Sequence, residues 1–455
     1  MGSNMPLHRF PESKPRQPRR SLSMSIPGAE DAVTVGTVIG MSRKHKAFSF
    51  RLSGTVMLFF MCAFLLLAFR NGQTDMFCLI LAVAVPAAIF LGSRLLPKLF
   101  PIDDILFTLT NFLCGLGILT LYITRPAYAV SQLVSYAVGL AAMIFTIIAV
   151  RTIKVRSWHL PVLLLIPLSL VLLSLPVLSG SEINGAKNWL ILGSFHFQPS
   201  ELVKITALVI ISYYMSKHRF LPWLLFSLLC LGLLMLQKDL GTALVYYGTI
   251  LLLYWVSSGS LFGTGLGIAG GVFAAILGYN MFAHVRVRVA VWRNPWIDYD
   301  NTGYQLVQSL IAIASGGFSG VGLGQGDPTV IPVYESDFIF SVICEQFGGI
   351  FGLCVLLIYV AIIWRGVSVA MSARSGFHGL LAIGATAMIA LQTFVIVGGV
   401  IKMIPLTGVT MPFISYGGSS MVSAMCLSGL IQGVSGLNRD ALDEDTRIAM
   451  RDDLD

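Results

Sequence analysis

Charged residues are scarce in this sequence. Only 11% of the 455 residues are Asp, Glu, Lys or Arg, whereas 56% are hydrophobic, and the mean hydropathy is +0.81. A soluble protein of this length could not bury so much apolar surface, so the composition excludes an ordinary soluble enzyme. The solvent is expected to be mostly membrane lipid, and no nucleic-acid partner is expected.

Cysteine is also sparse and carries no metal signature. The seven cysteines fall in apolar stretches without the paired spacing of zinc sites, so neither disulfides nor structural zinc is expected. No short apolar segment with a cleavage site follows the basic, proline-rich stretch PESKPRQPRRS. Residues 1–50 are therefore expected to be a disordered cytoplasmic arm and not a signal peptide.

Long apolar runs dominate what remains. Segments of roughly 17–25 residues, each long enough to cross a bilayer, recur along the chain. They predict an all-α integral membrane protein, a polytopic bundle of about twelve transmembrane helices. The expected spans are residues 53–69, 76–94, 104–124, 131–150, 159–178, 199–216, 221–236, 240–257, 262–283, 338–364, 378–400 and 410–434.

Basic residues in the short loops predict the orientation. If the amino terminus is cytoplasmic, the loops on that side agree with the positive-inside rule over most of the chain. These loops carry Arg94, Lys98, Arg151, Lys154, Arg156, Lys217, Arg219, Arg365 and Arg374. Both termini are then cytoplasmic, including a polar tail at residues 437–455, and the segments 179–198 and 284–337 lie on the outer face.

The second outer segment breaks the charge rule. It contains HVRVRVAVWRNPWIDYDNTGYQ, which places Arg286, Arg288 and Arg293 where arginine is normally scarce. Guanidinium groups there suit a phosphate or diphosphate ligand, which accepts their forked hydrogen bonds. Snorkelling to lipid headgroups explains any one of them equally well. The alternation in VRVRV fits either a short strand or a helix end lying in the interface.

Ionisable residues inside apolar spans are costly and therefore candidates for function. Glu201 and Lys204 stand three residues apart on one helical face, which also permits a plain internal salt bridge. Asp239 lies near a helix start, where helix capping is the simpler explanation. Each of these residues therefore has a structural reading beside the functional one.

Asp337, in YESDFIF, stands at the edge of an apolar run. Positions i, i+4 and i+8 share one face of a helix, so Asp337, Ser341 and Glu345 are expected to form a polar seam facing a cavity or another helix. Capping of the following helix by Asp337 is the alternative.

A segment close to the carboxyl terminus, PLTGVTMPFISYGGSSMVS, combines prolines and glycines with many hydroxyl groups. Prolines interrupt the helical hydrogen bonds, and small residues allow close approach of helices. The segment predicts a re-entrant or bent element lining a polar cavity, with simple tight packing as the alternative.

Five motifs resemble, in order and spacing, the signatures of the SEDS family, which includes FtsW, RodA and SpoVE. They are GAKNWLILGSFHFQPSELVKI, QKDLGTALV, GYQLVQSLIAIASGGFSGVGLG, ESDFIFSVICEQFG and PLTGVTMPFISYGGSS. The resemblance covers residues 104–436 and implies a core of about ten helices, so residues 51–96 are expected to be an added helix pair.

The resemblance also implies an activity. Members are glycosyltransferases of the bacterial cytoplasmic membrane that polymerise lipid II into peptidoglycan strands, with a class B penicillin-binding protein as partner and Mg²⁺ or Mn²⁺ as cofactor. Asp337 matches the family's essential acidic residue, which implies the general base and a candidate metal ligand. The residues expected to bind substrate are Lys187, Glu201, Lys204, Asp239, Arg286, Arg288, Arg293, Glu345 and Ser415.

Two positions depart from the family pattern, and two other functions stay open. Asn188 stands where the family commonly has arginine, with Lys187 as a substitute, and Lys238 replaces a proline. A transporter, or flippase, of lipid-linked cell-wall precursor would also use a polar cavity and intramembrane charges. A non-catalytic scaffold is the third reading. The sequence does not separate roles in elongation, division and sporulation.

Overall fold

The computed structural model describes residues 29–70, 74–183, 186–192 and 195–452, and the described residues from Arg51 onward belong to one compact unit. The helices are α1 (Ala29–Ala68), α2 (Met76–Leu99), α3 (Asp104–Thr124), α4 (Pro126–Thr152), α5 (His159–Ser179), α6 (Pro199–Ser216), α7 (Phe220–Leu236), α8 (Leu240–Ser258), α9 (Leu261–Met281), α10 (Ala283–Arg293), α11 (Tyr304–Gly316), α12 (Ile339–Phe347), α13 (Gly349–Met371), α14 (Gly376–Val400) and α15 (Gly418–Asp452). Short 3₁₀ turns lie at Val155–Trp158, Pro295–Asp298 and Pro328–Val330.

The all-α, polytopic class is confirmed. Among the described residues, ten helices are long and apolar enough to cross a membrane. They are α1 to α5, α8, α9 and α13 to α15. Helices α6 and α7, of 18 and 17 residues, lie where two further spans are expected and fall outside this group.

Both ends of the chain are more helical than the sequence indicates. Helix α1 starts at Ala29, so residues 29–50 are helical and not a disordered arm, whereas residues 1–28 lie outside the described part. The prolines of the arm end at Pro27, and the following residues contain none to interrupt a helix. At the other end, α15 continues through most of the expected tail, as far as Asp452.

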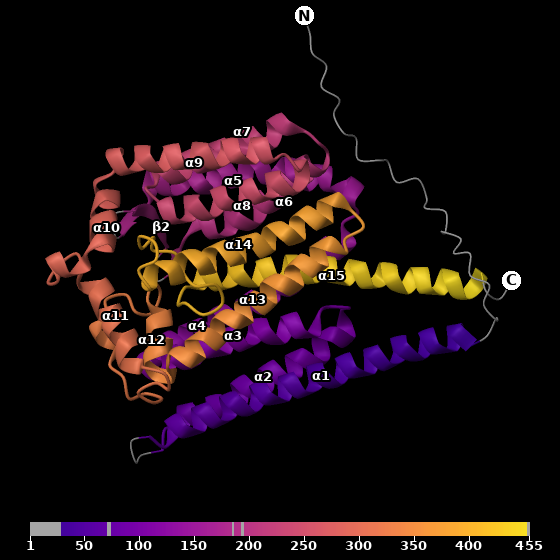
Figure 1. Cartoon of the computed structure of the whole chain (residues 1–455), viewed down its shortest axis with the longest axis horizontal. Coiled ribbons are helices and arrows are strands. Elements are labelled where there is room, and N and C mark those ends of the chain that lie inside the picture. The colour runs from indigo at the N-terminus through magenta and orange to yellow at the C-terminus, as the bar shows by residue number, and fades with distance from the viewer. Residues whose placement is uncertain (1–28, 71–73, 184–185, 193–194, 453–455) are drawn as a thin grey trace, which may run out of the picture. The chain divides into compact units, whose positions relative to one another are not determined.

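Helices α14 and α15 form much of the interior of the bundle. Helix α15 packs along α4 and also contacts α14 and α6, while α14 packs against α13, α8 and α6. Figure 1 shows both helices running between these neighbours. Helix α9 is the opposite case, because almost all of its surface is exposed. An apolar helix with so little protein contact must cover its surface with lipid or another protein.

Residues 51–96, expected to be an added helix pair, lie in α1 and α2, which pack on α3. The ring of Phe60 is buried against α3, so close that a Cβ at Gly115 would lie 2.6 Å from it. At the start of α2, Asp75 caps the helix by accepting hydrogen bonds from the amides of Phe77 and Cys78. It also accepts a 2.5 Å hydrogen bond from the Tyr122 hydroxyl of α3. The pair is therefore tied to the core at two places.

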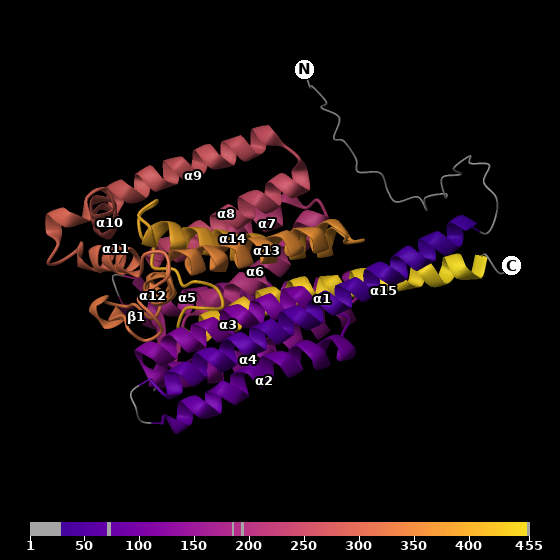
Figure 2. The same cartoon turned by 60° about the horizontal axis from the view of Figure 1, so that its bottom comes forward.

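A small antiparallel sheet follows α5, within residues 179–198, for which no strand is predicted from the sequence. Strand β2 (Ala186–Leu192) pairs with β1 (Ser181–Ile183) on one side and with β3 (Phe195–Phe197) on the other. Figures 1 and 2 place the sheet at the same end of the long helices as α10, α11 and α12. This end carries the long connections between α5 and α6, between α10 and α12 and between α14 and α15.

The expected span 338–364 is wrong, because the chain breaks at Gly348. This glycine has φ of 90°, and a Cβ there would lie 2.2 Å from the carbonyl oxygen of Phe318. Gly349 N–H donates instead to the carbonyl of Gly317. This break results from the close approach of residues 316–326, the glycine-rich loop. It divides the expected span into a nine-residue helix, α12, and a separate spanning helix, α13.

Candidate functional site

A cavity of about 340 Å³ opens at the end of the bundle that carries α10, α11 and α12. One helix face of α10, the start of α11, the turn before α12 and the segment after α14 enclose it. Its lining residues are His284, Val287, Arg288, Val291, Trp292, Thr302, Gln305, Leu306, Val333, Asp337, Leu406 and Gly408. The cavity has the size of a small-ligand site and contains one carboxylate and one guanidinium.

Asp337 lies in the turn that precedes α12, half-buried in the cavity wall. Its amide donates to the carbonyl of Val333, and its Oδ1 accepts a 2.8 Å hydrogen bond from the Ser336 hydroxyl. Helix α12 begins at Ile339, and Phe338 occupies the capping position without a side-chain hydrogen bond. The capping explanation for Asp337 is therefore wrong, because its carboxylate accepts no amide of the helix.

The surroundings of Asp337 make it an unusually basic carboxylate. Burial raises the pKa of Asp337 to about 6, and the nearby charge of Glu335 acts in the same direction. The Ser336 hydrogen bond and the Arg288 charge lower the pKa without cancelling the effect of burial. The group is thus ionised at neutral pH and still able to take a proton.

The turn that holds Asp337 stores backbone strain. Val333 has φ of 58°, a conformation that a β-branched residue rarely adopts. Its carbonyl accepts the amides of both Ser336 and Asp337, so the unusual backbone aims that carbonyl at the turn. Strain of this kind persists where the surrounding structure positions a functional group.

Arg288 and Asp337 both lie next to Gly408. A Cβ added at Gly408 would lie 3.6 Å from Asp337 Oδ2 and 3.6 Å from an Nη of Arg288. The other Nη of Arg288 donates a 2.8 Å hydrogen bond to the carbonyl of Thr407. Burial lowers the pKa of Arg288, while the charges of Asp337 and Asp239 raise it. Glycine at position 408 leaves space between the two charged groups.

The other two predicted arginines do not share this site. Segment 283–293 is a helix, α10, which settles the choice between strand and helix. Residues 286 and 288 therefore point to different faces, and Arg286 and Arg293 are exposed and absent from the cavity lining. Only Arg288 of the three is placed to contact a ligand next to Asp337.

His284 lines the cavity but is not among the residues predicted from the sequence. It stands one helical turn before Arg288, and its Nε2 is buried without a hydrogen-bond partner among the described residues. Burial, with the charges of Arg288 and Lys238, lowers its pKa, so the imidazole is neutral at neutral pH. The i, i+4 spacing of His284 and Arg288 on an amphipathic helix was the available signal.

The segment between α14 and α15 is irregular, as its prolines and glycines predict, and it borders the cavity through Leu406 and Gly408. Ser415 does not reach the cavity lining. Its buried hydroxyl donates a 2.5 Å hydrogen bond to the carbonyl of Ser336 and accepts from the amide of Met411. Ser415 thus supports the turn that carries Asp337.

Asp239 caps helix α8 as expected, through a hydrogen bond from the amide of Thr242 to Oδ1. Its Oδ2 accepts hydrogen bonds of 2.8 Å from Asn188 and 3.1 Å from Gln198. Asn188, at the position where the family commonly has arginine, therefore contacts a carboxylate. Asp239 lies outside the cavity lining but influences Arg288 through its charge.

Lys238 and Lys187 both have structural contacts. Lys238 has φ of 59°, a value closed to proline, and its amide donates to the carbonyl of Met235 at the end of α7. The backbone that enters α8 therefore requires a residue other than proline at position 238. The Lys187 ammonium donates to the carbonyl of Val177, so it points to the end of α5 and is absent from the cavity lining.

Glu201 and Lys204 form a fully buried ion pair of 2.7 Å on α6. Lys204 also donates to Gln392 of α14, and Ser423 of α15 donates to Glu201 at 2.5 Å. Gln392 in turn donates to the carbonyl of Thr410 in the irregular segment. The pair therefore joins three helices and this segment, and neither residue lines the cavity.

The expected seam of Asp337, Ser341 and Glu345 is wrong, because Asp337 is not part of the helix. Ser341 bonds the Ser309 hydroxyl of α11 at 2.7 Å. Glu345 packs against the glycine-rich loop, where a Cβ at Gly326 would lie 2.5 Å from its carboxyl carbon. Glu345 therefore supports the loop and is absent from the cavity lining.

The residues around Asp337 fit a divalent cation only in a limited way. Within the described ranges, no group of three or more His, Cys, Asp or Glu side chains could hold a metal ion. Mg²⁺ often binds through one or two carboxylates and completes its shell with substrate phosphates and water. Asp337 could supply such a carboxylate beside a phosphorylated ligand.

Comparison with known proteins gives one consistent family. The profile of the family FTSW_RODA_SPOVE, described as "Cell cycle protein", matches residues 118–440. The chain is 35% identical over 289 residues to peptidoglycan glycosyltransferase RodA of Mycobacterium tuberculosis, covering 58% of this chain and 62% of that protein. It is 31% identical over 366 residues to stage V sporulation protein E of Bacillus subtilis, covering 74% and 98%.

A solved structure agrees. A chain from a peptidoglycan synthase complex that coordinates polymerization and crosslinking is 27% identical, with a TM-score of 0.63. The match covers 74% of this chain and 98% of that one. The same match leaves about a quarter of the present chain without a counterpart.

Proposed function

Because this chain belongs to the family of cell cycle proteins that includes FtsW, RodA and SpoVE, we propose that it is a peptidoglycan glycosyltransferase. Its substrate is lipid II, as both donor and acceptor, and its product is a glycan strand on the outer face of the bacterial cytoplasmic membrane. The names of the relatives favour this activity over a transporter. The presence of Asp337 and Arg288 together in the lining of one cavity is the observation that carries the proposal.

Asp337 is the general base. In glycan polymerisation, a sugar hydroxyl of one substrate attacks the anomeric carbon of the other, and the bond from that carbon to the diphosphate oxygen breaks. The hydroxyl proton passes to the carboxylate of Asp337, whose pKa of about 6 suits a base that works near neutral pH. Inversion at the anomeric carbon needs no second carboxylate as nucleophile.

Arg288 stabilises the leaving group. Negative charge develops on the lipid diphosphate as the bond breaks, and a pre-positioned guanidinium favours that charge most in a partly desolvated site. Its link to the carbonyl of Thr407 holds the side chain in place. His284 is neutral and can donate or accept one hydrogen bond to the substrate from the same helix face.

A divalent cation, Mg²⁺ or Mn²⁺, joins this arrangement in the proposal. When bound, such an ion neutralises diphosphate charge and orients its oxygens. Asp337 would hold it together with the substrate's own phosphates. Arg288 supplies further positive charge from the wall of the same cavity.

The chain is a multi-pass membrane protein, and we propose its orientation from the loop charges. Arg94 and Lys98 lie near the C-terminal end of α2, Arg365 lies near that of α13, and Arg374 follows α13. Figure 1 shows these two helix ends on the side opposite α10, α11 and α12, and the positive-inside rule assigns this side to the cytoplasm. Both termini are then cytoplasmic, and the cavity faces the outer leaflet, where lipid-linked sugars are presented. A class B penicillin-binding protein is the proposed cross-linking partner.

The test is polymerisation of lipid II by purified protein in detergent, where no membrane separates two sides. Asp337→Asn keeps the shape of the side chain and removes the base, so the rate should fall about 10²–10⁴-fold. Asp300→Asn, in an exposed part of the same outer segment, is the matched control and should polymerise normally. Near-normal product from folded Asp337→Asn protein would refute the assignment, and absence of product from the unaltered protein would favour a transporter.

A further inference from the structure

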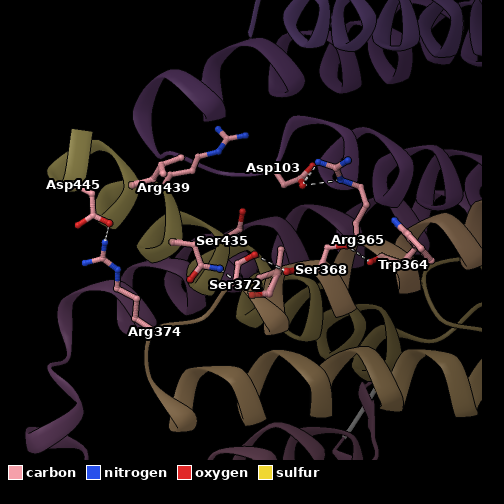
Figure 3. A pocket seen from close by; sticks show the side chains of 12 residues that line it. Asp103, Trp364, Arg365, Ser368, Ser372, Arg374, Ser435, Arg439 and Asp445 are labelled. Atoms are coloured by element: carbon pink, nitrogen blue, oxygen red, sulfur yellow. Dashed lines mark hydrogen bonds and ion pairs between the residues drawn. The ribbon is translucent and has the colours of Figure 1, made fainter. Parts of the chain in front are cut away.

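A second cavity, of about 490 Å³, lies at the opposite end of the bundle from Asp337. It is enclosed by the ends of α13 and α15, by the start of α3 and by the turn between α13 and α14. Its lining residues are Asp103, Trp364, Arg365, Ser368, Val369, Ser372, Arg374, Ser435, Asn438, Arg439, Leu442 and Asp445. Figure 3 shows these side chains around the cavity.

Two ion pairs form opposite walls of this cavity. On one side, Arg365 donates from Nε at 2.7 Å and from Nη2 at 2.5 Å to a single oxygen of Asp103. Asp103 is buried and caps α3 through its other oxygen, so this wall is rigid. On the other side, Arg374 pairs with Asp445 and donates to the carbonyl of Ala441.

Arg439 lies between the two pairs, as Figure 3 shows. It is half-buried and forms no ion pair with any carboxylate in the described ranges. Three arginines therefore face two aspartates, which leaves one positive charge uncompensated in a partly closed space. An anion is the ligand that such a site attracts.

The approach to the cavity is apolar on one side. Leu357, Val360 and Trp364 of α13 are 57%, 58% and 75% exposed, and they follow one another at helical spacing. This row forms part of the face of α13 that the bilayer covers, and Trp364 both ends the row and lines the cavity. An acyl chain lying along this row would place its headgroup beside the arginines.

We propose that this cavity binds a phosphate-bearing anion, with the phosphate between Arg439 and the two flanking arginines, Arg365 and Arg374. The apolar row along α13 favours an anionic phospholipid as the source of that phosphate. The Ser435 hydroxyl lines the same space and can donate to a phosphate oxygen, whereas the hydroxyls of Ser368 and Ser372 donate to the carbonyls of Trp364 and Ser368. The inference does not depend on the proposed reaction, and the orientation decides only which leaflet supplies the lipid.

Quenching of Trp364 fluorescence by brominated lipid tests the proposal. The full chain is placed in phosphatidylcholine bilayers that contain either brominated phosphatidylglycerol or brominated phosphatidylcholine, and subtraction of the Trp364→Phe signal isolates Trp364. Brominated phosphatidylglycerol should quench at lower mole fraction. Arg439→Gln should weaken this apparent affinity about tenfold, because it removes a charge-assisted contact.

Arg447→Gln is the matched control, because Arg447 is exposed on the same helix and outside the cavity. It should quench like the unaltered protein. Arg374→Gln, whose side chain is 54% exposed, is the second variant if Arg439→Gln fails to fold, and it should also weaken the lipid preference.

A separate arm distinguishes a soluble source of phosphate. The melting temperature of the protein in detergent is measured with inorganic phosphate and with chloride at equal ionic strength. A rise with phosphate alone that Arg439→Gln abolishes would support the site with a soluble phosphate compound as ligand. Equal quenching by both lipids, together with no specific phosphate effect, would overturn the proposal.

Discussion

The charge of Arg288 should control the pH at which the protein starts to work. Asp337 must lose its proton before it can act as a base, so activity should fall as the pH drops through the pKa of about 6. Arg288 lowers this pKa, because a nearby positive charge favours the ionised carboxylate. Arg288→Gln should therefore move the acidic limb of the pH profile to higher pH.

The size of the shift can be worked from the site. An opposite charge within about 4–6 Å shifts a carboxyl pKa by roughly one to three units, and Arg288 also interacts with Asp239, so we expect roughly one unit. The ratio of the rate at pH 6 to that at pH 8 should be about 0.5 in the unaltered protein and about 0.1 in Arg288→Gln. The rate at pH 8 should itself fall roughly 10²–10³-fold with the loss of leaving-group stabilisation.

The assay is initial-rate polymerisation of lipid II in detergent across this pH range, at the lowest Mg²⁺ concentration that supports activity, because a cation held by Asp337 would itself lower the pKa of that carboxyl. Arg286→Gln is the matched control, because it removes the same charge two residues away on an exposed face of α10 and should leave the acidic limb near pH 6. Arg288→Lys should keep the limb near pH 6 and lose part of the rate, since lysine retains the charge without the forked donors. If the acidic limb of the pH–rate profile of Arg288→Gln stays near pH 6 or moves to lower pH, the reasoning is refuted.

The remaining predictions concern two groups outside the cavity. Lys204→Met should lower the free energy of unfolding by about 3–5 kcal/mol, because it leaves the Glu201 carboxylate buried without its partner. Unfolding in denaturing detergent measures this loss of stability. The double variant Lys204→Met, Glu201→Gln should recover part of the lost stability. Equal stability of the single and double variants would contradict this explanation. Glu345→Gln should retain measurable polymerisation, since Glu345 supports a loop, and a loss as complete as that of Asp337→Asn would contradict this role.

Some parts of the site follow from local sequence alone. Pro199 and the charge spacing on α6 predict a helix with Glu201 and Lys204 on one face, and the structure confirms their pairing. Asp239 before an apolar run predicts a cap, which it forms on α8. These features depend on residues within one or two helical turns, so helical periodicity is enough to find them.

Other predictions about the site were wrong because the features concerned depend on contacts between segments that are distant in the chain. The break at Gly348 arises from the approach of the loop at residues 317–320, and nothing in the apolar run from 338 onward reveals it. The break and the start of α12 at Ile339 removed Asp337 from its expected helical row. Ser415 looked like a ligand residue, yet its hydroxyl supports the turn beside Asp337 from a segment 79 residues away.

The sequence by itself determined that this is a multi-pass helical protein and that Asp337 stands at the edge of the apolar region. Hydropathy and helical periodicity are properties of residues that are neighbours in the chain, so they can be read directly from the linear sequence. The tertiary structure alone decided that Arg288, and neither Arg286 nor Arg293, lines the same cavity as Asp337, and that Gly408 lies next to both. Burial and charge at Asp337 are sums over segments far apart in the chain, and only folding brings those segments within a few ångströms of one another.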